Sequence, residues 1–223
     1  MFIRETSTNE AELVLRKPVE GVVYVVDDDE LVRGSLADLF KSVDLEVKAF
    51  DTIDDFARVP KPDCPACLVL DVRVRGGNGI LFQKSLADAR QSHMPIVFIS
   101  GYGDVPMTVK AMKAGAIDFL AKPFRDQDLV DAVLSGLELD RQRLAVEKSR
   151  SGFRVAWRSL TNREREVLVH VADGRSNREV AELMGVAELT TKLYRGSAMR
   201  KMNLRSVAEL LRMMDVVRDR YEA

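Results

Sequence analysis

Between residues 21 and 125, short apolar runs alternate with segments whose apolar residues recur every three or four positions. The first run, 22–26, is continuous and rich in β-branched residues, as expected of a strand buried on both faces of a sheet. The predicted strands are 22–26, 47–50, 67–70, 96–99 and 117–121. The predicted helices hold Leu31 to Val43 and cover 53–59, 80–89 and 105–114. Repeated strand–helix units with short connections predict a parallel α/β sheet with right-handed crossovers.

A longer helical segment is predicted to begin near Asp126. Its apolar residues form one stripe, at Leu129, Val133, Leu137 and Leu144. Such a long charged helix is usually a solvated spacer, although the stripe is also compatible with pairing to a second copy in a coiled coil. Ser151 and Gly152 are predicted to break the helix.

The segment 160–214 has the pattern of four short helices. Thr161, with Glu164 three residues later, carries the capping-box signature of the first helix. Ser176 is predicted to cap the second helix, and Gly185 to form a tight turn after it because glycine accepts positive φ. The third and fourth helices are predicted at 189–202 and 207–214. This order predicts a helix-turn-helix domain.

The chain is therefore expected to divide into four parts. They are an N-terminal extension at 1–20, an α/β domain at 21–125, a long helix or linker at 126–152 and a helical domain at 153–223. The two larger parts differ in charge: 21–122 holds 15 acidic and 12 basic residues, and 151–215 holds 12 basic and 8 acidic residues. The basic part is the one expected to meet a polyanion such as DNA.

The composition, with 46% apolar and 31% charged residues among 223, is that of a globular protein of one or two domains. No apolar stretch reaches the ~18–20 residues that cross a bilayer, and no signal peptide is evident, which predicts a cytoplasmic protein without membrane contact. Cys64 and Cys67 form a CxxC pair, but neither His93 nor His170 supplies further ligands at zinc-finger spacing. Two reduced, structural cysteines are predicted.

Five polar side chains follow or end the predicted strands. They are Asp27 and Asp28 after the first strand, Asp71 after the third, Ser100 after the fourth and Lys122 after the fifth. In an open parallel sheet the carboxyl ends of the strands converge on one crevice, where ligands bind. Each of these residues is ordinary by itself, but the set, in this order and all at strand ends, is specific. It indicates a carboxylate that accepts a phosphoryl group.

The residue types suit that chemistry. In-line phosphoryl transfer spreads negative charge over the phosphoryl oxygens, so positioning and cations provide most of the catalysis. Asp27, Asp28 and Asp71 offer the oxygen ligands that Mg²⁺ prefers. Lys122 supplies a positive charge for a phosphoryl oxygen, and the Ser100 hydroxyl is a donor whose position reports whether the group is present.

Residues 21–124 resemble the receiver domains of bacterial response regulators. The resemblance rests on the runs 101–107, 111–119 and 122–124, which are most similar to the FixJ branch. It implies a flavodoxin-like, doubly wound fold with five parallel strands in the order 2-1-3-4-5. It also implies Asp71 as the phosphoacceptor, Lys122 as the phosphate-binding lysine, and a Mg²⁺ (or Mn²⁺) ion bound by Asp27, Asp28, Asp71 and the Arg73 backbone carbonyl.

The same resemblance assigns a switch and a dimer face. Ser100 and Phe119 match the pair whose hydroxyl and ring reorient on phosphorylation. The face with Val109 and Lys113 often carries the phosphorylation-driven dimer contact in this family. One departure is Arg75, which stands where the family usually has a proline. Because proline would stiffen the loop, this loop is expected to be more mobile.

The predicted third helix is basic, and 189–205 contains no acidic residue. Its cations are Lys192, Arg195, Arg200, Lys201 and Arg205. Residues 160–215 resemble the LuxR-type helix-turn-helix of the NarL/FixJ response regulators, which implies DNA binding through this helix. The implied base contacts are Lys192, Leu193 and Gly196, and the implied backbone contacts are Thr190, Tyr194, Arg195 and Lys201, with Arg200 beside them. Gly196 has no side chain to present, and Leu189 departs from the polar or basic residue that is frequent there.

The two resemblances together predict a two-component transcriptional regulator. A sensor histidine kinase is expected to phosphorylate Asp71, and a homodimer formed on phosphorylation is expected to bind an inverted repeat in double-stranded promoter DNA. The resemblance also implies a contact with RNA polymerase. The protein is not expected to be an enzyme, since the receiver assists only its own phosphoryl transfer and dephosphorylation.

Two other functions share features with this sequence. In one, the receiver only dimerises and DNA binding is independent of phosphorylation, an alternative motivated by the loop that contains Arg75. In the other, the chain is a phosphohydrolase of the haloacid-dehalogenase type. Such enzymes need a second Asp two residues after the first, and that position is Arg73.

Overall fold

The computed structural model describes residues 21–75, 77–88, 94–101 and 105–218. The predicted extension at 1–20, His93 and the 102–104 part of the FixJ-like run lie outside these residues. The chain divides into two compact units at Leu144–Ala145. We call them the N-terminal unit and the C-terminal unit, and describe each by itself.

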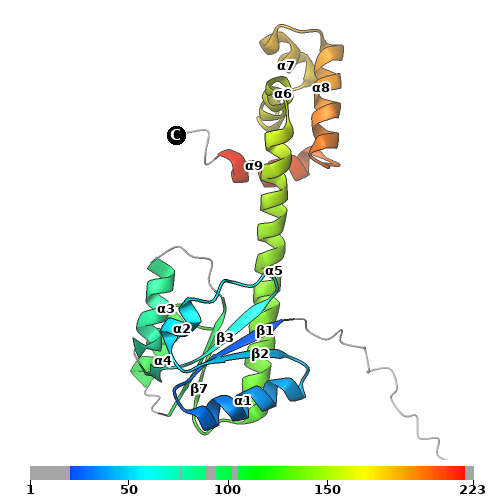
Figure 1. The fold of residues 1–223 in the computed structure, drawn as a ribbon. Coiled ribbons are helices and arrows are strands. Elements are labelled where there is room, and N and C mark those ends of the chain that lie inside the picture. The colour runs from blue at the N-terminus through cyan, green and yellow to red at the C-terminus, as the bar shows by residue number, and fades with distance from the viewer. Residues whose placement is uncertain (1–20, 76, 89–93, 102–104, 219–223) are drawn as a thin grey trace, which may run out of the picture. The chain divides into compact units, whose positions relative to one another are not determined.

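The N-terminal unit contains the predicted parallel sheet (Figure 1). Its strands are β1 (Val22–Val26), β2 (Glu46–Phe50), β3 (Ala66–Asp71), β6 (Ile96–Ser100) and β7 (Asp118–Ala121). They lie in the order β2-β1-β3-β6-β7, and every neighbouring pair is parallel. Numbered along the chain, these five strands have the predicted order, so the fold prediction is confirmed.

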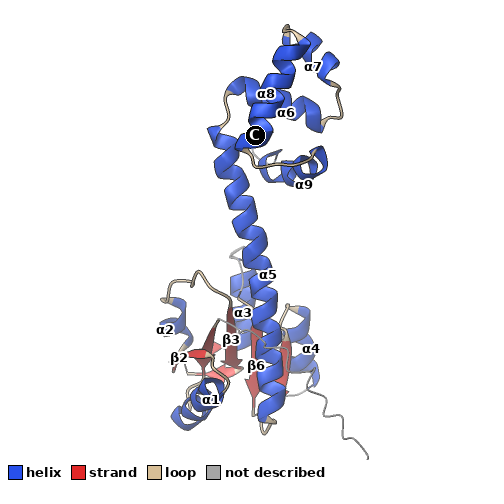
Figure 2. Ribbon diagram, turned by 90° about the vertical axis from the view of Figure 1, so that its right-hand side faces the viewer, coloured by secondary structure: helices blue, strands red, loops and turns tan. Residues whose placement is uncertain are grey.

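Helices cover both faces of this sheet (Figures 1 and 2). They are α1 (Glu30–Ser42), α2 (Ile53–Ala57), α3 (Gly79–Asp88), α4 (Val105–Lys113) and α5 (Asp126–Ser159). One core layer joins the strands to α1 and α5, and the other joins them to α2, α3 and α4. Side chains alternate along a strand, so Val23 and Val25 enter the first layer while Tyr24 and Val26 enter the second.

A short hairpin that the sequence did not predict follows β3. Strands β4 (Arg73–Val74) and β5 (Gly77–Asn78) are antiparallel, with Arg73 paired to Asn78 and Val74 to Gly77. Asn78 Oδ1 then accepts a hydrogen bond from the Ile80 N–H at 2.9 Å, at the start of α3. The turn at Arg75, where the family usually has proline, is therefore flanked by the β4–β5 pairing and by this side-chain contact.

The two cysteines are free thiols that pack on opposite faces of the sheet. Cys67 is fully buried in the layer of α1 and α5, whereas Cys64 contacts the layer of α2, α3 and α4. Burial raises the pKa of the Cys67 thiol, which makes it a poor nucleophile. The positions of the two residues agree with the structural role predicted for them.

Helix α5 differs from the prediction in two respects. It continues to Ser159, so the break predicted at Ser151–Gly152 is wrong. Its stripe residues Leu129, Val133 and Leu137 are 0% exposed in the core of the N-terminal unit, so the coiled-coil alternative is wrong for them. The sequence shows an apolar stripe but does not show what covers it, because a sheet and a second helix require the same spacing.

Close packing of α5 on β3 depends on Gly136. A Cβ atom there would lie 2.7 Å from Cys67 Sγ and 3.2 Å from Ile117 Cδ1. Gly136→Ala is therefore expected to lower the free energy of unfolding by about 1–2 kcal/mol, because overpacking costs more than helix propensity returns. Gly152→Ala, in the same helix with nothing within 4 Å, should instead raise it by about 0.5–1 kcal/mol. Urea unfolding of the full chain measures both, and equal stabilisation by both would contradict this packing.

The C-terminal unit is helical, as predicted. It contains the end of α5 together with α6 (Asn162–Ala172), α7 (Asn177–Met184), α8 (Glu188–Lys201) and α9 (Val207–Arg218). The capping box of Thr161 and Glu164 is present, and Ser176 caps α7 in the same way. Gly185 ends α7 with φ +64°, as the predicted tight turn requires. Phe153 and Trp157 at the end of α5 belong to the core of this unit.

Candidate functional site

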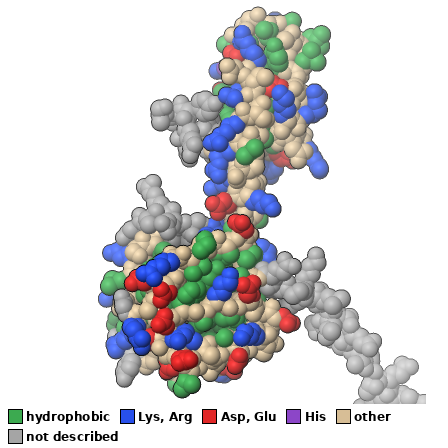
Figure 3. Space-filling model, in the orientation of Figure 1, with side chains coloured by type: hydrophobic (Ala, Val, Ile, Leu, Met, Phe, Trp, Pro, Cys, Tyr) green, Lys and Arg blue, Asp and Glu red, His purple; other side chains and the backbone are tan. Residues whose placement is uncertain are grey.

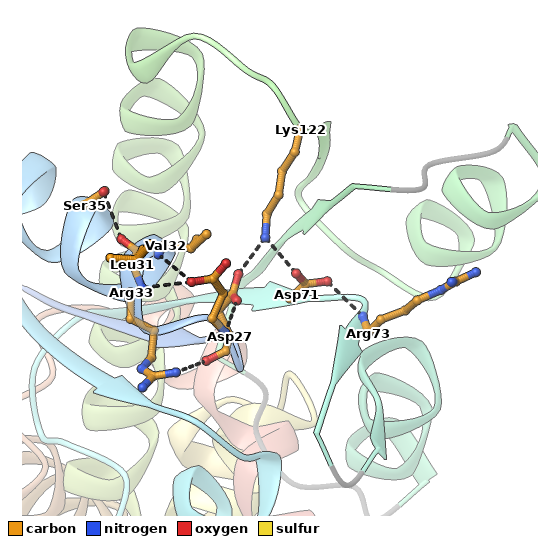
Figure 4. Close-up of polar contacts among 9 residues, drawn as sticks. Asp27, Leu31, Val32, Arg33, Ser35, Asp71, Arg73 and Lys122 are labelled. Carbon is orange, nitrogen blue, oxygen red and sulfur yellow. Dashed lines mark hydrogen bonds and ion pairs between the residues drawn. The ribbon is translucent and has the colours of Figure 1, made fainter.

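Two of the acids predicted at the strand ends, Asp27 and Asp71, meet at Lys122. Lys122 Nζ lies 2.7 Å from Asp27 Oδ2 and 2.7 Å from Asp71 Oδ2 (Figure 4). Asp27 is only 1% exposed and Asp71 8%. One ammonium group therefore binds two nearly buried carboxylates from different strands, which offsets their mutual repulsion.

Backbone groups fix the other oxygen of each carboxylate. Asp27 Oδ1 accepts the Asp29 N–H at 2.9 Å, and Asp71 Oδ1 accepts the Arg73 N–H at 2.9 Å. Arg33 also donates to the Asp27 carbonyl at 2.7 Å. The Arg73 side chain extends away from Asp71, so only its backbone meets the carboxylate (Figure 4). One oxygen of each acid is thus held by the loop while the other faces the shared ammonium.

Burial and the ion pairs shift the pKa values in this cluster. Burial raises the pKa of Asp27, and hydrogen bonds from Lys122 and the Asp29 N–H offset only part of that rise. For Lys122, burial lowers the pKa, but hydrogen bonds to Asp27 and Asp71 outweigh burial and raise it above its usual value. Lys122 is therefore cationic at neutral pH.

The predicted metal ligands are brought together only in part. Asp28 is exposed and takes no part in the ion pairs with Lys122. Within the described residues, no group of three His, Cys, Asp or Glu side chains could hold a metal ion without other ligands. The acids of Asp27 and Asp71 nevertheless converge on one cation, and their oxygens are the ligand type of Mg²⁺. The donor set therefore fits a divalent cation at this point.

The predicted switch residues occupy the two strands beside this cluster. Ser100 ends β6 and is 1% exposed, and it pairs in register with Ala121, next to Lys122. Phe119 is half-buried in β7, with its ring centroid 6.3 Å from that of Phe98. Ser100 thus adjoins the strand end where Asp71 lies, whereas Phe119 lies in β7 three residues before Lys122.

The predicted dimer face lies on α4. Val109 is 43% exposed, and Lys113 is exposed one turn later. Val105 and Met112, 77% and 42% exposed, belong to the same face because they are spaced by three or four residues from Val109. The sequence showed this spacing, but only the structure shows that the sheet does not cover it.

Helix α8 carries the side chains predicted to meet DNA. Lys192, Leu193, Arg200 and Lys201 are exposed, and Thr190, Tyr194 and Arg195 are partly buried. Three of these cations, Lys192, Arg195 and Lys201, have partners within the unit. Arg195 donates to Asn177 Oδ1 at 2.9 Å, and Lys192 lies 2.9 Å from Glu188, which α8 includes at its start. Lys and Arg side chains are spread over the visible face of this unit (Figure 3).

Glu164 organises a polar network that sequence reasoning did not find. Its carboxylate is 4% exposed and accepts hydrogen bonds from Lys201 at 2.8 Å, Ser197 at 2.7 Å and the Thr161 N–H at 2.8 Å. Burial alone would raise its pKa, but these donors, Lys201 foremost, lower the pKa to about 2. Lys201, predicted to contact the DNA backbone, is thus tied to α6. The capping signature signalled Glu164, but no local pattern signalled its partners on α8.

Comparisons with known proteins agree with this architecture. Residues 23–134 match the response regulator receiver domain, and residues 158–214 match bacterial regulatory proteins of the luxR family. Nodulation protein W of Bradyrhizobium diazoefficiens is 46% identical over 198 residues, which cover 89% of this chain and 87% of that protein. Transcriptional regulatory protein FixJ of Azorhizobium caulinodans is 40% identical over 193 residues, covering 86% and 90%. A low-resolution structure of response regulator StyR matches with a TM-score of 0.76 and 42% identity, covering 88% of this chain and 98% of that one.

The fold, the cluster at the strand ends and the two family matches together define the class of protein. It is a receiver domain joined to a LuxR-type helix-turn-helix domain. The chain belongs to the NarL/FixJ family of response regulators. This membership places it among transcription regulators rather than among phosphohydrolases. Within the described residues, no helix has the length and apolar character needed to cross a membrane.

Proposed function

We propose that this chain is a phosphorylation-activated, DNA-binding transcription regulator whose phosphoacceptor is Asp71. The observation that carries the proposal is the ammonium of Lys122 bound to both Asp27 and Asp71. This geometry holds one Asp71 oxygen near a cation and fixes the other on a backbone N–H. An acid held this way is positioned to attack phosphorus in line.

The phosphoryl donor is a phosphohistidine of a sensor histidine kinase. An Asp71 oxygen forms the new O–P bond, the N–P bond breaks, and its electron pair stays on the imidazole. Asp27, Asp28, Asp71 and the Arg73 carbonyl would hold Mg²⁺ (or Mn²⁺), which supplies positive charge to the phosphoryl oxygens. Lys122, close to Asp71, donates to one phosphoryl oxygen. The receiver assists only the phosphorylation of its own Asp71 and the later hydrolysis of that acyl phosphate.

Ser100 and Phe119 report the phosphoryl group to the rest of the N-terminal unit. The Ser100 hydroxyl donates to a phosphoryl oxygen, and the half-buried Phe119 ring moves inward toward the space that the hydroxyl leaves. The change reaches α4, where Val109 and Lys113 lie on an exposed face. Pairing of that face forms the homodimer.

The dimer presents two C-terminal units to an inverted repeat in double-stranded promoter DNA. Lys192 and Leu193 face base edges, while Thr190, Tyr194, Arg195, Arg200 and Lys201 serve the sugar–phosphate backbone. Support comes from the exposed cations of α8 and from the relative named as the transcriptional regulatory protein FixJ. The DNA-bound dimer acts through RNA polymerase in the bacterial cytoplasm.

Sedimentation of the full chain tests this function. With Mg²⁺ alone we expect a monomer, and with Mg²⁺ and beryllofluoride, a mimic of the phosphoryl group, a dimer. Asp71→Asn should remain monomeric in both conditions. Asp44→Asn is the matched control, since Asp44 is exposed after α1 and its φ of 59° suits asparagine. A wild-type mass that beryllofluoride does not change would instead favour a receiver that acts without phosphorylation.

A further inference from the structure

The outward face of α8 is apolar at its beginning. Leu189 is 69% exposed and Leu193 65%, while Thr191 and Ala198 on the opposite face are 0% exposed. At about 100° per residue, the two leucines and Arg200 point directly away from that buried face. Figure 3 shows hydrophobic side chains at the end of the C-terminal unit where α8 begins.

Cations border this apolar pair. Lys192 lies on the flank of the outward face, where Glu188 pairs with it at 2.9 Å, and Arg200 lies two turns beyond Leu193. Gly196 stands between Leu193 and Arg200, and a Cβ atom there would lie 3.7 Å from Arg200 Nη1, so the guanidinium folds back over the glycine. The outward face therefore changes from apolar to cationic along α8.

The positive charge beside Leu189 and Leu193 indicates what kind of partner binds the outward face of α8. Lys192 and Arg200 suit a polyanion, and the adjoining leucines require an apolar group on that same polyanion. In duplex DNA the major groove offers one such group, the 5-methyl of thymine. A recognition helix meets base edges mainly through residues near its N-terminus, and Leu189 and Leu193 lie in the N-terminal half of α8.

We infer that Leu189 reads a thymine methyl group in the major groove, extending by one turn the apolar contact that Leu193 makes. The inference rests on the proposed DNA-binding function and deepens it, because it names a base that the regulator prefers. It also gives a role to Leu189, which the sequence showed only as a departure from the polar residue that is frequent there.

The test removes the methyl group from the DNA and the side chain from the protein. Duplexes are selected from a randomised pool with the full chain in Mg²⁺ and beryllofluoride. Each thymine of a selected duplex is then replaced, one at a time, by deoxyuridine, which lacks only the 5-methyl group. At the base that Leu189 meets, the replacement should weaken wild-type binding roughly fourfold, the effect of one buried methylene. Leu189→Ala should bind the thymine and deoxyuridine duplexes equally.

The control is Leu81→Ala, since Leu81 is 68% exposed on α3 of the other unit and undergoes the same truncation. This variant should keep the full sensitivity to deoxyuridine. If no duplex is enriched, the proposed DNA-binding function is wrong, and the inference with it. If duplexes are enriched but Leu189→Ala keeps the wild-type response to every deoxyuridine, only the inference is overturned. If Leu189→Ala keeps that response to deoxyuridine but changes the sedimenting mass, Leu189 and Leu193 belong to a protein contact. That result also overturns the inference.

Discussion

Lys122→Met is expected to lower the free energy of unfolding of the N-terminal unit by about 3 kcal/mol at pH 7. Removing one partner of a buried ion pair costs about 3–5 kcal/mol because an uncompensated charge remains. Here two carboxylates would remain, with Asp27 1% and Asp71 8% exposed. The lower end of that range applies because the Lys122 side chain is 24% exposed and solvent replaces part of the lost interaction.

The pH dependence of this loss has a definite sign. Burial already raises the pKa of Asp27, and without Lys122 the pKa rises further. A carboxyl with a raised pKa destabilises the folded state above the unfolded value of 3.8, so the loss should shrink as the pH falls toward it. The raised pKa of Lys122 stabilises the wild type below its unfolded value of 10.5. That contribution disappears as the pH rises through the folded pKa, so the difference between the proteins should also shrink at high pH.

Mg²⁺ should restore part of the stability that Lys122→Met loses. The ion and the ammonium compete for the same two carboxylates, so the variant gains more from Mg²⁺ than the wild type does. The effect is measured by urea unfolding with and without Mg²⁺. Hydrogen exchange in peptides from β1 and β3 monitors the N-terminal unit. Lys113→Met, which removes an exposed lysine of α4, is the control and should change stability by less than about 0.5 kcal/mol. Equal losses in the two variants would mean that the cluster carries no unusual electrostatic energy.

The parallel sheet and its chemistry could be predicted because both depend on local patterns. Continuous β-branched runs such as Val22–Val26 indicate strands covered on both faces, and strand ends of one sheet lie at one edge. Placing Asp71 and Lys122 at strand ends was therefore enough to predict that they meet. The ion pair at 2.7 Å was not predictable, because in the sequence Lys122 could equally point to solvent.

Other features depend on partners that are distant in the sequence. The stripe with Leu129 and Val133 gives the same pattern whether a sheet or a second helix covers it, so its burial in the N-terminal unit needed the structure. Gly152 resembles a helix end in the sequence, but glycine inside a helix costs only about 1 kcal/mol and long helices tolerate it. The β4–β5 hairpin is too short to leave a hydrophobic pattern.

The polar network around Glu164 in the C-terminal unit also depends on partners that are distant in the sequence. Its contribution to stability can be measured. Four donors converge on the Glu164 carboxylate: the Thr161 N–H and hydroxyl, Ser197 Oγ and Lys201 Nζ. Glutamine is neutral and keeps one acceptor oxygen, so Glu164→Gln loses the ion pair with Lys201, and its NH₂ group can only donate where the carboxylate accepted the Ser197 hydroxyl. We expect the free energy of unfolding of this unit to fall by about 2–3 kcal/mol at pH 7. The lowered pKa, about 2 against an unfolded value of 4.5, corresponds to somewhat more, but Lys201 is 42% exposed and partly screened.

Trp157 allows this unit to be followed by itself. It is the single tryptophan of the chain, is 5% exposed and lies in the core that α6 shares. A lowered carboxyl pKa stabilises the fold above the unfolded pKa, so the wild type should lose this contribution as the pH falls from about 4.5 to about 2. Urea unfolding monitored by Trp157 fluorescence should show Glu164→Gln less stable at pH 7 and the two proteins converging across that window.

Glu166→Gln separates the network from the mere loss of a charge on α6. Glu166 lies 3.0 Å from Arg163 at a site where both side chains are at least 40% exposed, so its removal should cost less than about 0.5 kcal/mol. If Glu164→Gln is as stable as Glu166→Gln, other hydrogen-bond partners such as water satisfy the four donors as well as the carboxylate does. If the expected difference holds, a buried acid in a basic unit is explained: Glu164 joins α6 to α8 through Ser197 and Lys201, and so sets the position of the helix proposed to enter the major groove.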